Sequence, residues 1–288
     1  MRILKKFDPW RSPLCPCPQK YTLNPYTGCG FKCIYCYITS YIKDPFNPRP
    51  KKDLLKNLKR DLDSYKGRLR IAIAYSTDPY TYPEAEYKLT RRILELLAKY
   101  DVEVLIATKS TLISRDIDLL KRLNAVVSIT ITTLDDETAR LIEPNVPRPS
   151  ARLRVVEKLI KNGIKVSLRI DPVIPYITDD LNMIKKLIKL AYDMGVSHIV
   201  SSIYKAKPDS FRRVLDVFPD KKGDLMRLYT EYGIQVYGYR YPPYSYRYKI
   251  LKYIRDNTLK YNLTFNTCRE GMRYLDTPNS YCDASHLL

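Results

Sequence analysis

The sequence predicts an α/β fold, a partial (β/α)6 TIM-like barrel followed by an irregular C-terminal extension. Short apolar runs alternate with segments of helical periodicity as far as residue 203, which is typical of βαβ units and a parallel sheet. Six such units can be counted when the segment before Cys29 is taken as the first strand. Six units with right-handed crossovers make a partial barrel.

The individual elements follow in order along the chain. Helices are expected where apolar residues recur every three or four positions, and strands where short runs are apolar and β-branched. Three predicted helices are 53–64, 84–99 and 115–122. A fourth begins at its cap Ser150 and ends at Gly163, and a fifth begins at its cap Thr178 and ends near Met194, before Gly195. The predicted strands are 70–75, 102–108, 125–133, 164–170 and 196–203, followed by aromatic turns, a helix near 245–260 and a strand at 262–268.

These elements divide the chain into three parts. Residues 1–20 form a segment rich in cysteine and proline, residues 21–204 form the barrel core, and residues 205–288 form an extension packed on the barrel. No stretch approaches the ~20 apolar residues of a membrane span. The opening residues lack the apolar core of a secretory signal. We therefore expect a cytoplasmic protein with no membrane partner, and the sequence selects no oligomeric state.

The charge balance is strongly basic, because 50 Lys and Arg stand against 31 Asp and Glu, a formal net charge of +19. A surface of this kind attracts polyanions through charge and counterion release, which favours nucleic acid or a phosphate-bearing substrate as partner. The alternative is a solvated surface without a partner. The abundance of Tyr, Lys, Ile and Arg, with few Gly, suits a thermophile.

Tyrosines interleave with Arg and Lys over residues 237–255, and residues 51–70 carry many cations around the helix predicted at 53–64. Aromatic rings can stack on unpaired bases while cations hold phosphates. The alternative is that the tyrosines pack onto the barrel and the cations stay in solvent. A nucleobase substrate would have to be flipped out of its stack, or single-stranded, to reach a buried site.

The strongest motif is NPYTGCGFKCIYCY at residues 24–37, which contains C-x3-C-x2-C at Cys29, Cys33 and Cys36. A [4Fe–4S] cube has four irons, so three thiolates leave one iron open. An open iron can chelate the amino and carboxylate groups of S-adenosylmethionine (SAM). One electron, from a donor such as ferredoxin, then breaks the S–C5′ bond of SAM and yields a 5′-deoxyadenosyl radical that abstracts hydrogen from a substrate.

The setting of this motif supports a metal site. Gly28 and Gly30 allow the turns that wrap three thiolates around one cube. The loop follows the first strand and is expected to precede a helix, which places it at the C-terminal face of the sheet, where α/β sites form. Seven cysteines in a reducing compartment favour metal or redox chemistry over disulfides. Zinc stays open as an alternative, with a fourth ligand drawn from the remaining cysteines.

This run resembles the radical SAM enzymes, whose motif is C-x3-C-x-aromatic-C, with Tyr35 at the aromatic position. More specifically, the chain is similar to the branch around spore photoproduct lyase, also described as DNA repair photolyase-like. The resemblance spans residues 20–200. Besides the cysteine motif it is carried by STDPYTYPE at 76–84, ATKS at 107–110, SITITTLDDE at 128–137 and RIDPVIP at 169–175.

The resemblance implies roles for residues at or near the C-terminal ends of strands. Tyr35 would lie against the adenine of SAM. The groups that would face the amino and carboxylate groups are Ser76, Thr77 and Lys109, with Lys109 pairing the carboxylate. Ser128 and Arg169 would line the ribose and carboxylate side. The alternative for each polar residue is a solvated position at a strand end.

The chain also departs from the pattern of spore photoproduct lyases. Those enzymes use a cysteine near the second strand as hydrogen donor, whereas here no cysteine lies between Cys36 and Cys268. Tyr37 matches the tyrosine that follows the cluster in those enzymes, and Cys268 is a candidate hydrogen donor or electron relay. The resemblance therefore carries over the reaction type, with Tyr37 and Cys268 as candidate catalytic residues, but not the substrate.

Four cysteines remain outside the motif, and they flank the barrel on both sides in sequence. If the chain ends meet, four thiolates could bind an auxiliary Fe–S cluster or a structural zinc. The alternatives are free thiols, or a disulfide between Cys268 and Cys282 in a thermophile. The four residues are Cys15, Cys17, Cys268 and Cys282.

Three functions remain open at this point. The first is a radical SAM enzyme that repairs or modifies a nucleic acid base. The second is a radical SAM enzyme that modifies a peptide, a protein or a small metabolite, for which the basic charge would be incidental. The third is a nucleic-acid-binding protein that a metal stabilises and that catalyses nothing.

Overall fold

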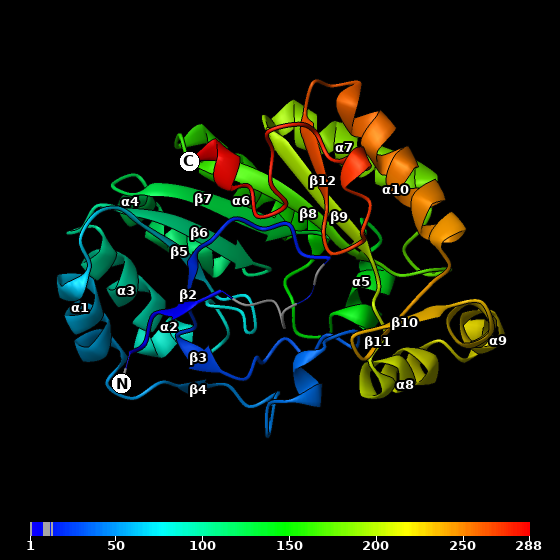
Figure 1. The fold of residues 1–288 in the computed structure, drawn as a ribbon, viewed down its shortest axis with the longest axis horizontal. Coiled ribbons are helices and arrows are strands. Elements are labelled where there is room, and N and C mark those ends of the chain that lie inside the picture. The colour runs from blue at the N-terminus through cyan, green and yellow to red at the C-terminus, as the bar shows by residue number, and fades with distance from the viewer. Residues whose placement is uncertain (1, 8–11, 13) are drawn as a thin grey trace.

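The centre of the molecule is an eight-stranded sheet, seen in Figure 1. The computed structural model describes residues 2–7, 12 and 14–288. The strand order is β1-β2-β5-β6-β7-β8-β9-β12. All neighbours from β2 to β12 are parallel, and β1 is antiparallel to β2 at the edge. The strands are β1 (Lys5–Lys6), β2 (Tyr21–Leu23), β5 (Leu69–Ile73), β6 (Val102–Thr108), β7 (Asn124–Thr130), β8 (Lys165–Val173), β9 (His198–Ile203) and β12 (Thr264–Thr267).

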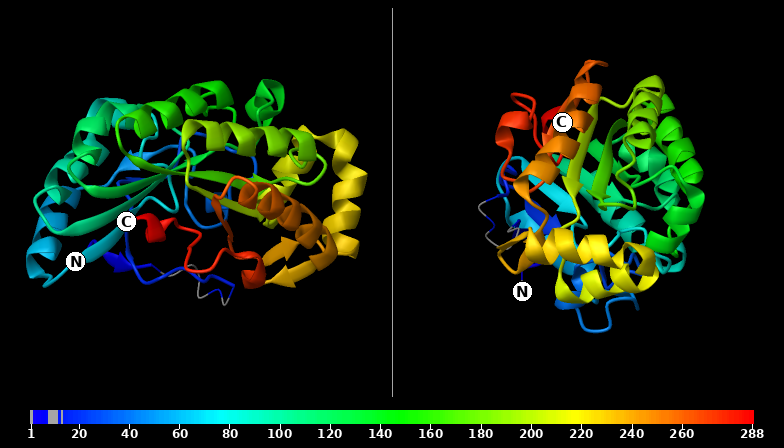
Figure 2. Two further views of the ribbon diagram at one scale, coloured as in Figure 1. Left: turned by 90° about the horizontal axis from the view of Figure 1, so that it is seen from above. Right: turned by 90° about the vertical axis from the view of Figure 1, so that its right-hand side faces the viewer.

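Helices connect the strands and cover one side of the sheet, and both ends of the chain lie on the other side (Figure 2). Two small antiparallel pairs, β3 (Tyr26–Thr27) with β4 (Arg49–Pro50) and β10 (Ile234–Val236) with β11 (Tyr239–Tyr241), stand apart from it. The helices are α1 (Leu54–Ser64), α2 (Glu84–Tyr87), α3 (Leu89–Leu97), α4 (Ile117–Leu120), α5 (Asp136–Ile142), α6 (Pro149–Lys161), α7 (Leu181–Met194), α8 (Pro208–Val217), α9 (Lys222–Met226) and α10 (Tyr244–Leu259).

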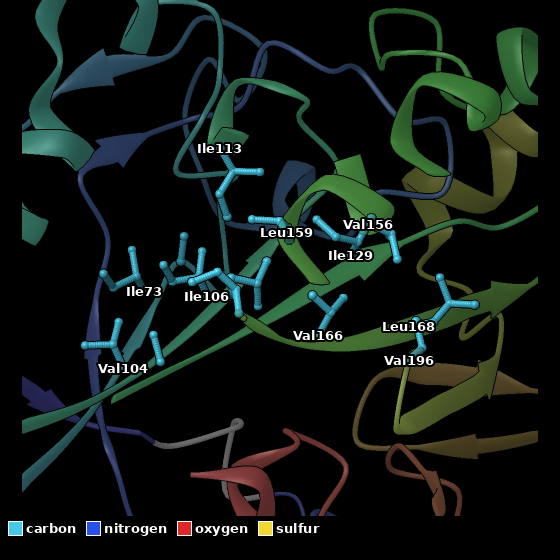
Figure 3. Packing of buried hydrophobic residues seen from close by; sticks show 14 of the residues in the cluster. Ile73, Val104, Ile106, Ile113, Ile129, Val156, Leu159, Val166, Leu168 and Val196 are labelled. Carbon is cyan, nitrogen blue, oxygen red and sulfur yellow. The ribbon is translucent and has the colours of Figure 1, made fainter. Parts of the chain in front are cut away.

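The core lies between the sheet and its helices. Strands in a parallel sheet are buried on both faces, so they consist largely of β-branched and aliphatic residues, as β6 and β7 do. Val156 and Leu159 of α6 lie beside Ile129 of β7 in this core (Figure 3). The same packing holds every strand end in place, which gives the polar residues beyond those ends fixed positions.

The α/β fold with a parallel sheet is confirmed, and the structure adds a strand to it. The sequence indicated six parallel strands, but β12 pairs in parallel with β9 and makes a seventh. The segment after residue 204 therefore completes the sheet as well as packing against it. The cysteine motif is followed by a single turn at Ile38–Ser40 rather than by the expected helix.

Three helix boundaries differ from expectation, each for a local reason. The stretch 84–99 breaks into α2 and α3 because Lys88 adopts a left-handed conformation with φ of 50°. Helix α6 starts at Pro149, which suits a first helical position, so Ser150 is not its cap. Asp180, rather than Thr178, caps α7 by accepting the N–H groups of Asn182 and Met183.

The helices in the described part of the chain were also compared with the length and apolarity of a membrane span. None of them is long and apolar enough to cross a bilayer.

Candidate active site

A cavity of about 500 Å³ opens at the C-terminal ends of the parallel strands. Such ends meet at one edge of a parallel sheet, where α/β enzymes bind their ligands. The cavity brings together nearly all residues that the sequence singled out, from segments up to 267 positions apart. Of these residues, Cys15, Cys17, Cys29, Cys33, Tyr35, Cys36, Tyr37, Ser76, Thr77, Lys109, Arg169, Cys268 and Cys282 line it.

The cysteine loop, residues 28–37, is held by hydrogen bonds from distant segments. The backbone N–H of Cys29 donates to the carbonyl of Pro45 at 2.7 Å, and that of Ile34 donates to the carbonyl of Ile142 at 3.0 Å. Arg213 of α8 donates to the carbonyls of Ile34 and Cys36, at 3.0 and 2.8 Å. These contacts fix the direction of the three thiols although the loop itself is not part of a helix or strand.

Gly28 is needed for the shape of the cysteine loop. Its φ of +85° lies in the left-handed region, which side chains rarely adopt. A Cβ atom there would also stand 2.9 Å from the carbonyl oxygen of Asn47 and 3.0 Å from that of Pro45, both of them backbone atoms. The glycine thus lets the chain turn against the 45–47 segment immediately before the first cysteine.

Tyr35 is held by a buried ion pair behind the cysteine loop. Its hydroxyl donates to the carboxylate of Glu143, which also accepts from Thr132 at 3.3 Å. Arg152 of α6 lies 2.7 Å from the other oxygen of that carboxylate, and both side chains are buried. Arg152 in turn donates to the carbonyl of Thr130 at the end of β7. The ring of Tyr35 is thereby fixed at the cavity wall.

Lys109 stands where β6 ends, and Asp78 determines its position. The carboxylate of Asp78 accepts from the backbone N–H of Lys109 at 2.8 Å and from the Thr108 hydroxyl at 2.7 Å. The Lys109 ammonium lies 5.7 Å from the centre of the Tyr35 ring. Burial alone would lower the pKa of Lys109, but negative charge at Cys33, Glu143 and Asp78 outweighs this and raises it. Lys109 is therefore a cation in the cavity wall at neutral pH.

The residues after β5 contribute hydroxyl groups to the same wall. Thr77 donates its hydroxyl to the carbonyl of Tyr26 at 3.1 Å, so this group also braces the start of the cysteine loop. Ser76 hydrogen-bonds to Tyr41. The Tyr37 hydroxyl donates to the carbonyl of Tyr75 at 2.6 Å, and burial raises the pKa of Tyr37 well above its usual value.

Ser128 is the one predicted cofactor residue that the structure does not bring to the cavity. Its hydroxyl shares a 2.6 Å hydrogen bond with Ser167 of the neighbouring strand, below the strand ends. Thr130 has the same side-chain direction because strand residues two apart share a face, and it reaches the cavity. Ser128 therefore lies on the face of β7 that reaches the cavity at Thr130, but deeper in the sheet.

Arg169 lies in the cavity wall but its guanidinium is already engaged. It donates to the carboxylate of Asp171 at 2.5 Å and to the carbonyl of Cys282 at 3.2 Å. Burial would raise the pKa of Asp171, but Arg169 and Lys205 outweigh it and hold this pKa at about 2. Arg169 thus connects the end of β8 to the C-terminal segment.

The remaining four cysteines, here called the four-cysteine group, meet in the wall of the same cavity. The Sγ atoms of Cys17 and Cys282 are 3.3 Å apart. Cys15 interacts with Cys17, and Cys268 interacts with Cys282, whose hydrogen bond lowers the pKa of Cys268 to about 7. Among the described residues, no three His, Cys, Asp or Glu side chains already stand in the arrangement of ligands around a single metal ion.

The thiols of the cysteine loop suit a [4Fe–4S] cluster in both number and charge. Burial is the main influence on all three, and it raises the pKa of Cys29 to about 12. Buried thiolates are costly without a cation or a metal. Lys109 provides positive charge toward Cys33 and Cys36, and Arg213 provides it toward Cys36. The positive charges of Lys109 and Arg213 would therefore already lie near a cluster held by the three cysteines of the loop.

Several residues of this site gave no recognisable signal in the sequence. Glu143 and Arg152 act through a contact between two helix-terminal regions, which no local pattern encodes. Glu270 accepts from Lys205 at 2.7 Å and from Arg247 at 2.9 Å beside the cavity. Asp78 could have been found, since it lies in the STDPYTYPE segment directly after Ser76 and Thr77.

Comparison with known sequences gives a family match and several relatives. The family model of the Radical SAM superfamily matches residues 23–191. "Uncharacterized protein ORF301" of Acidianus two-tailed virus is 31% identical over 204 residues, 62% of this chain and 65% of that protein. "Uncharacterized protein MJ0683" of Methanocaldococcus jannaschii is 33% identical over 171 residues, 56% of this chain and 62% of that protein. The chain thus spans slightly under two thirds of the length of these two relatives.

Solved structures share the fold. A mutant of spore photoproduct lyase with bound AdoMet and dinucleoside spore photoproduct has a TM-score of 0.63 at 17% identity, covering 84% of this chain and 72% of that one. SuiB of Streptococcus suis bound to S-adenosylmethionine has a TM-score of 0.55 at 15% identity, covering 85% of this chain and 49% of that one. At such identities the likeness concerns the fold.

Proposed function

The chain belongs to the radical SAM superfamily, and from that premise we propose that it is an enzyme that abstracts hydrogen from a nucleic acid base to repair or modify it. A [4Fe–4S] cluster with SAM supplies the 5′-deoxyadenosyl radical for this reaction by reductive cleavage of SAM. The observation that carries the proposal is the convergence of Cys29, Cys33 and Cys36 with Lys109 on one cavity at the strand ends. The electron would come from a one-electron donor such as ferredoxin.

The protein's own residues would bind and orient SAM in this cavity. Lys109 would neutralise the SAM carboxylate, and Ser76 and Thr77 would offer hydroxyl groups to its polar end. Tyr35, fixed by Glu143, would lie along the adenine. Tyr37 and Cys268 line the cavity as well and are the candidates for returning a hydrogen atom to the substrate.

Replacing Lys109 tests its part in SAM binding. Lys109→Met should weaken SAM binding by about 10- to 100-fold, because a hydrogen bond to a charged group is worth about 1.5–3 kcal/mol. Isothermal titration of anaerobically reconstituted protein with SAM measures this, and iron analysis shows whether the cluster is intact. Lys121→Met, a change at an exposed lysine in the turn after α4, is the control. Unchanged SAM affinity in Lys109→Met would contradict the assignment.

The walls and mouth of the cavity favour a polyanionic aromatic substrate. Six cations line it against three carboxylates, and two of these cations, Lys5 and Lys6 of β1, are exposed. At the same rim Lys207 lies 4.2 Å and Arg269 5.1 Å from the centre of the Tyr239 ring. Cations beside aromatic rings suit phosphates beside bases. The dinucleoside bound by the spore photoproduct lyase mutant supports the same substrate class.

Nucleic acid binding and turnover can be tested together. Tight binding of tRNA, rRNA or single-stranded DNA is expected, with an affinity that falls steeply as salt rises. In anaerobic assays with dithionite and SAM, the matching nucleic acid should increase 5′-deoxyadenosine release. Lys5→Glu/Lys6→Glu should weaken nucleic acid binding by about tenfold or more and reduce the salt dependence.

The matched control reverses two charges on the far side of the molecule. Lys185→Glu/Lys186→Glu changes two exposed lysines of α7 by the same total charge. Equal losses in both double variants would assign the binding to net charge rather than to the cavity mouth. If no nucleic acid binds or raises 5′-deoxyadenosine release, while a peptide or metabolite pool does, the nucleic acid proposal is wrong and the radical SAM assignment stands.

A further inference from the structure

The geometry points to a second metal centre in this protein, a thiophilic metal bound by the four-cysteine group in the wall of the cavity. Its ligands would be Cys15, Cys17, Cys268 and Cys282. A zinc ion and an iron–sulfur cluster share this tetrathiolate chemistry, and both are thus covered by the experiment below. The inference does not depend on the proposed function, since it concerns different residues.

The first support is the convergence of the four thiols. Cys15 and Cys17 lie in the N-terminal segment, Cys268 follows β12, and Cys282 lies near the C-terminus. Cys17 and Cys282 are 265 positions apart in sequence. The Cys17 and Cys282 sulfur atoms nevertheless approach to 3.3 Å. The two sulfur atoms on neighbouring corners of a zinc tetrahedron with bonds of about 2.3 Å lie about 3.8 Å apart. Irregular segments from both chain ends thus bring their thiols to one point.

The second support is the buried charge beside the thiols. Lys20 forms a 2.6 Å ion pair with Asp283, and the side chains of both are fully buried. One carboxylate neutralises one ammonium, so this pair alone leaves the site neutral. Four thiolates around a divalent ion carry a net negative charge. Arg169 donates to the carbonyl of Cys282 but is already paired with Asp171. Lys205, which acts electrostatically on Cys268, shares the single carboxylate of Glu270 with Arg247, and this leaves one positive charge beside the thiols. A buried cation surplus next to thiols is what a metal thiolate centre needs.

The four-cysteine group lies where a bound metal would link two distant segments of the chain. All four cysteines line the same cavity as Cys29, Cys33 and Cys36. A bound metal would join the N-terminal segment to the segment after β12 and so close one wall of the active-site cavity. Small irregular segments often depend on such a metal for their fold, because ligand binding then contributes directly to folding free energy.

Two complementary full-length variants separate the two metal centres. C29A/C33A/C36A keeps only the four-cysteine group, and C15A/C17A/C268A/C282A keeps only the cysteine loop. Both are purified anaerobically from cells supplied with iron and zinc, and their zinc, iron and acid-labile sulfide are measured. The first variant should retain one metal centre, either about one zinc without sulfide or iron with matching sulfide. The second should retain about four irons.

The outcomes distinguish this inference from the proposed function. A C29A/C33A/C36A protein without zinc and without iron overturns the second centre, whatever the other variant binds. A C15A/C17A/C268A/C282A protein that folds but binds no iron overturns the cluster assignment of the cysteine loop instead. Adding Cys282→Ala to the first variant should remove its metal, whereas adding Ser285→Ala, a change at a buried neighbour, should leave it.

A measurement on the unmodified protein keeps the inference testable if the variants do not fold. Thiol alkylation followed by mass spectrometry should find the four-cysteine group protected in the anaerobically purified protein and reactive after denaturation with a chelator. A disulfide between Cys17 and Cys282 in that protein, with metal content explained by the cysteine loop alone, would overturn the second centre.

Discussion

Cys33→Ala is expected to abolish 5′-deoxyadenosine release, to below about 1% of the unmodified protein, because the cofactor carries the chemistry and cannot be held without its ligands. Cys33 is buried at the centre of the cysteine loop, with Lys109 providing positive charge toward it. The iron content should fall together with the activity. Both are measured on protein reconstituted anaerobically, with dithionite as reductant and chromatographic detection of the product.

A control in the same loop separates loss of a ligand from loss of the loop's shape. Lys32 is exposed and adopts a φ of 55°, a conformation that asparagine also accepts, so Lys32→Asn should keep both iron and activity. Persistent release in Cys33→Ala would show that Cys33 is not a ligand, and equal loss in Lys32→Asn would assign the effect to the shape of the loop instead.

The second large effect is expected at the ion pair behind Tyr35. Arg152→Met should lower the free energy of unfolding by about 3–5 kcal/mol, because it leaves the buried carboxylate of Glu143 without its cation. Arg152 and Glu143 are both fully enclosed, 2.7 Å apart. The loss is measured as a shift of the urea unfolding curve. The Tyr35 ring should also lose its fixed orientation, because its hydroxyl donates to the same carboxylate.

A neighbouring exposed pair and a double variant provide the controls for Arg152→Met. Arg148 and Asp136 form an ion pair at the surface, so Arg148→Met should change stability by less than about 1 kcal/mol. Glu143→Gln added to Arg152→Met should recover part of the loss, since it removes the unpaired charge. If Arg152→Met alone is as mild as Arg148→Met, the buried pair does not support the site.

The cysteine loop and the strand ends could be predicted from the sequence because each depends on residues that are close together in the chain. The three cysteines of the motif, Cys29, Cys33 and Cys36, lie within eight residues, so their spacing alone predicts that one metal centre receives three thiolates. The strand β6 was predicted with its observed bounds, Val102–Thr108, because its apolar run ends sharply before Lys109. A polar residue directly after a buried strand has few places to go other than the strand-end cavity.

Other features depend on contacts that the sequence does not encode locally. A strand at 262–268 was expected, but its place in the sheet was not, because β12 pairs with β9 across more than 60 residues and no local pattern encodes that pairing. Ser128 and Thr130 share one face of β7, and only the register of the neighbouring strands decides which of the two reaches the cavity. The approach of Cys17 to Cys282 likewise requires the two chain ends to fold back together.

Radical chemistry in this cavity requires an open iron at the cysteine loop, and one spectroscopic comparison tests this directly. The anaerobically reconstituted C15A/C17A/C268A/C282A protein, which keeps only that loop, is reduced and its electron paramagnetic resonance spectrum recorded without and with SAM. If one iron is open, we expect the signal of a [4Fe–4S] cluster, and we expect that signal to change when SAM is added. A protein that carries zinc alone, or a cluster signal that SAM leaves unaltered, would contradict the open iron.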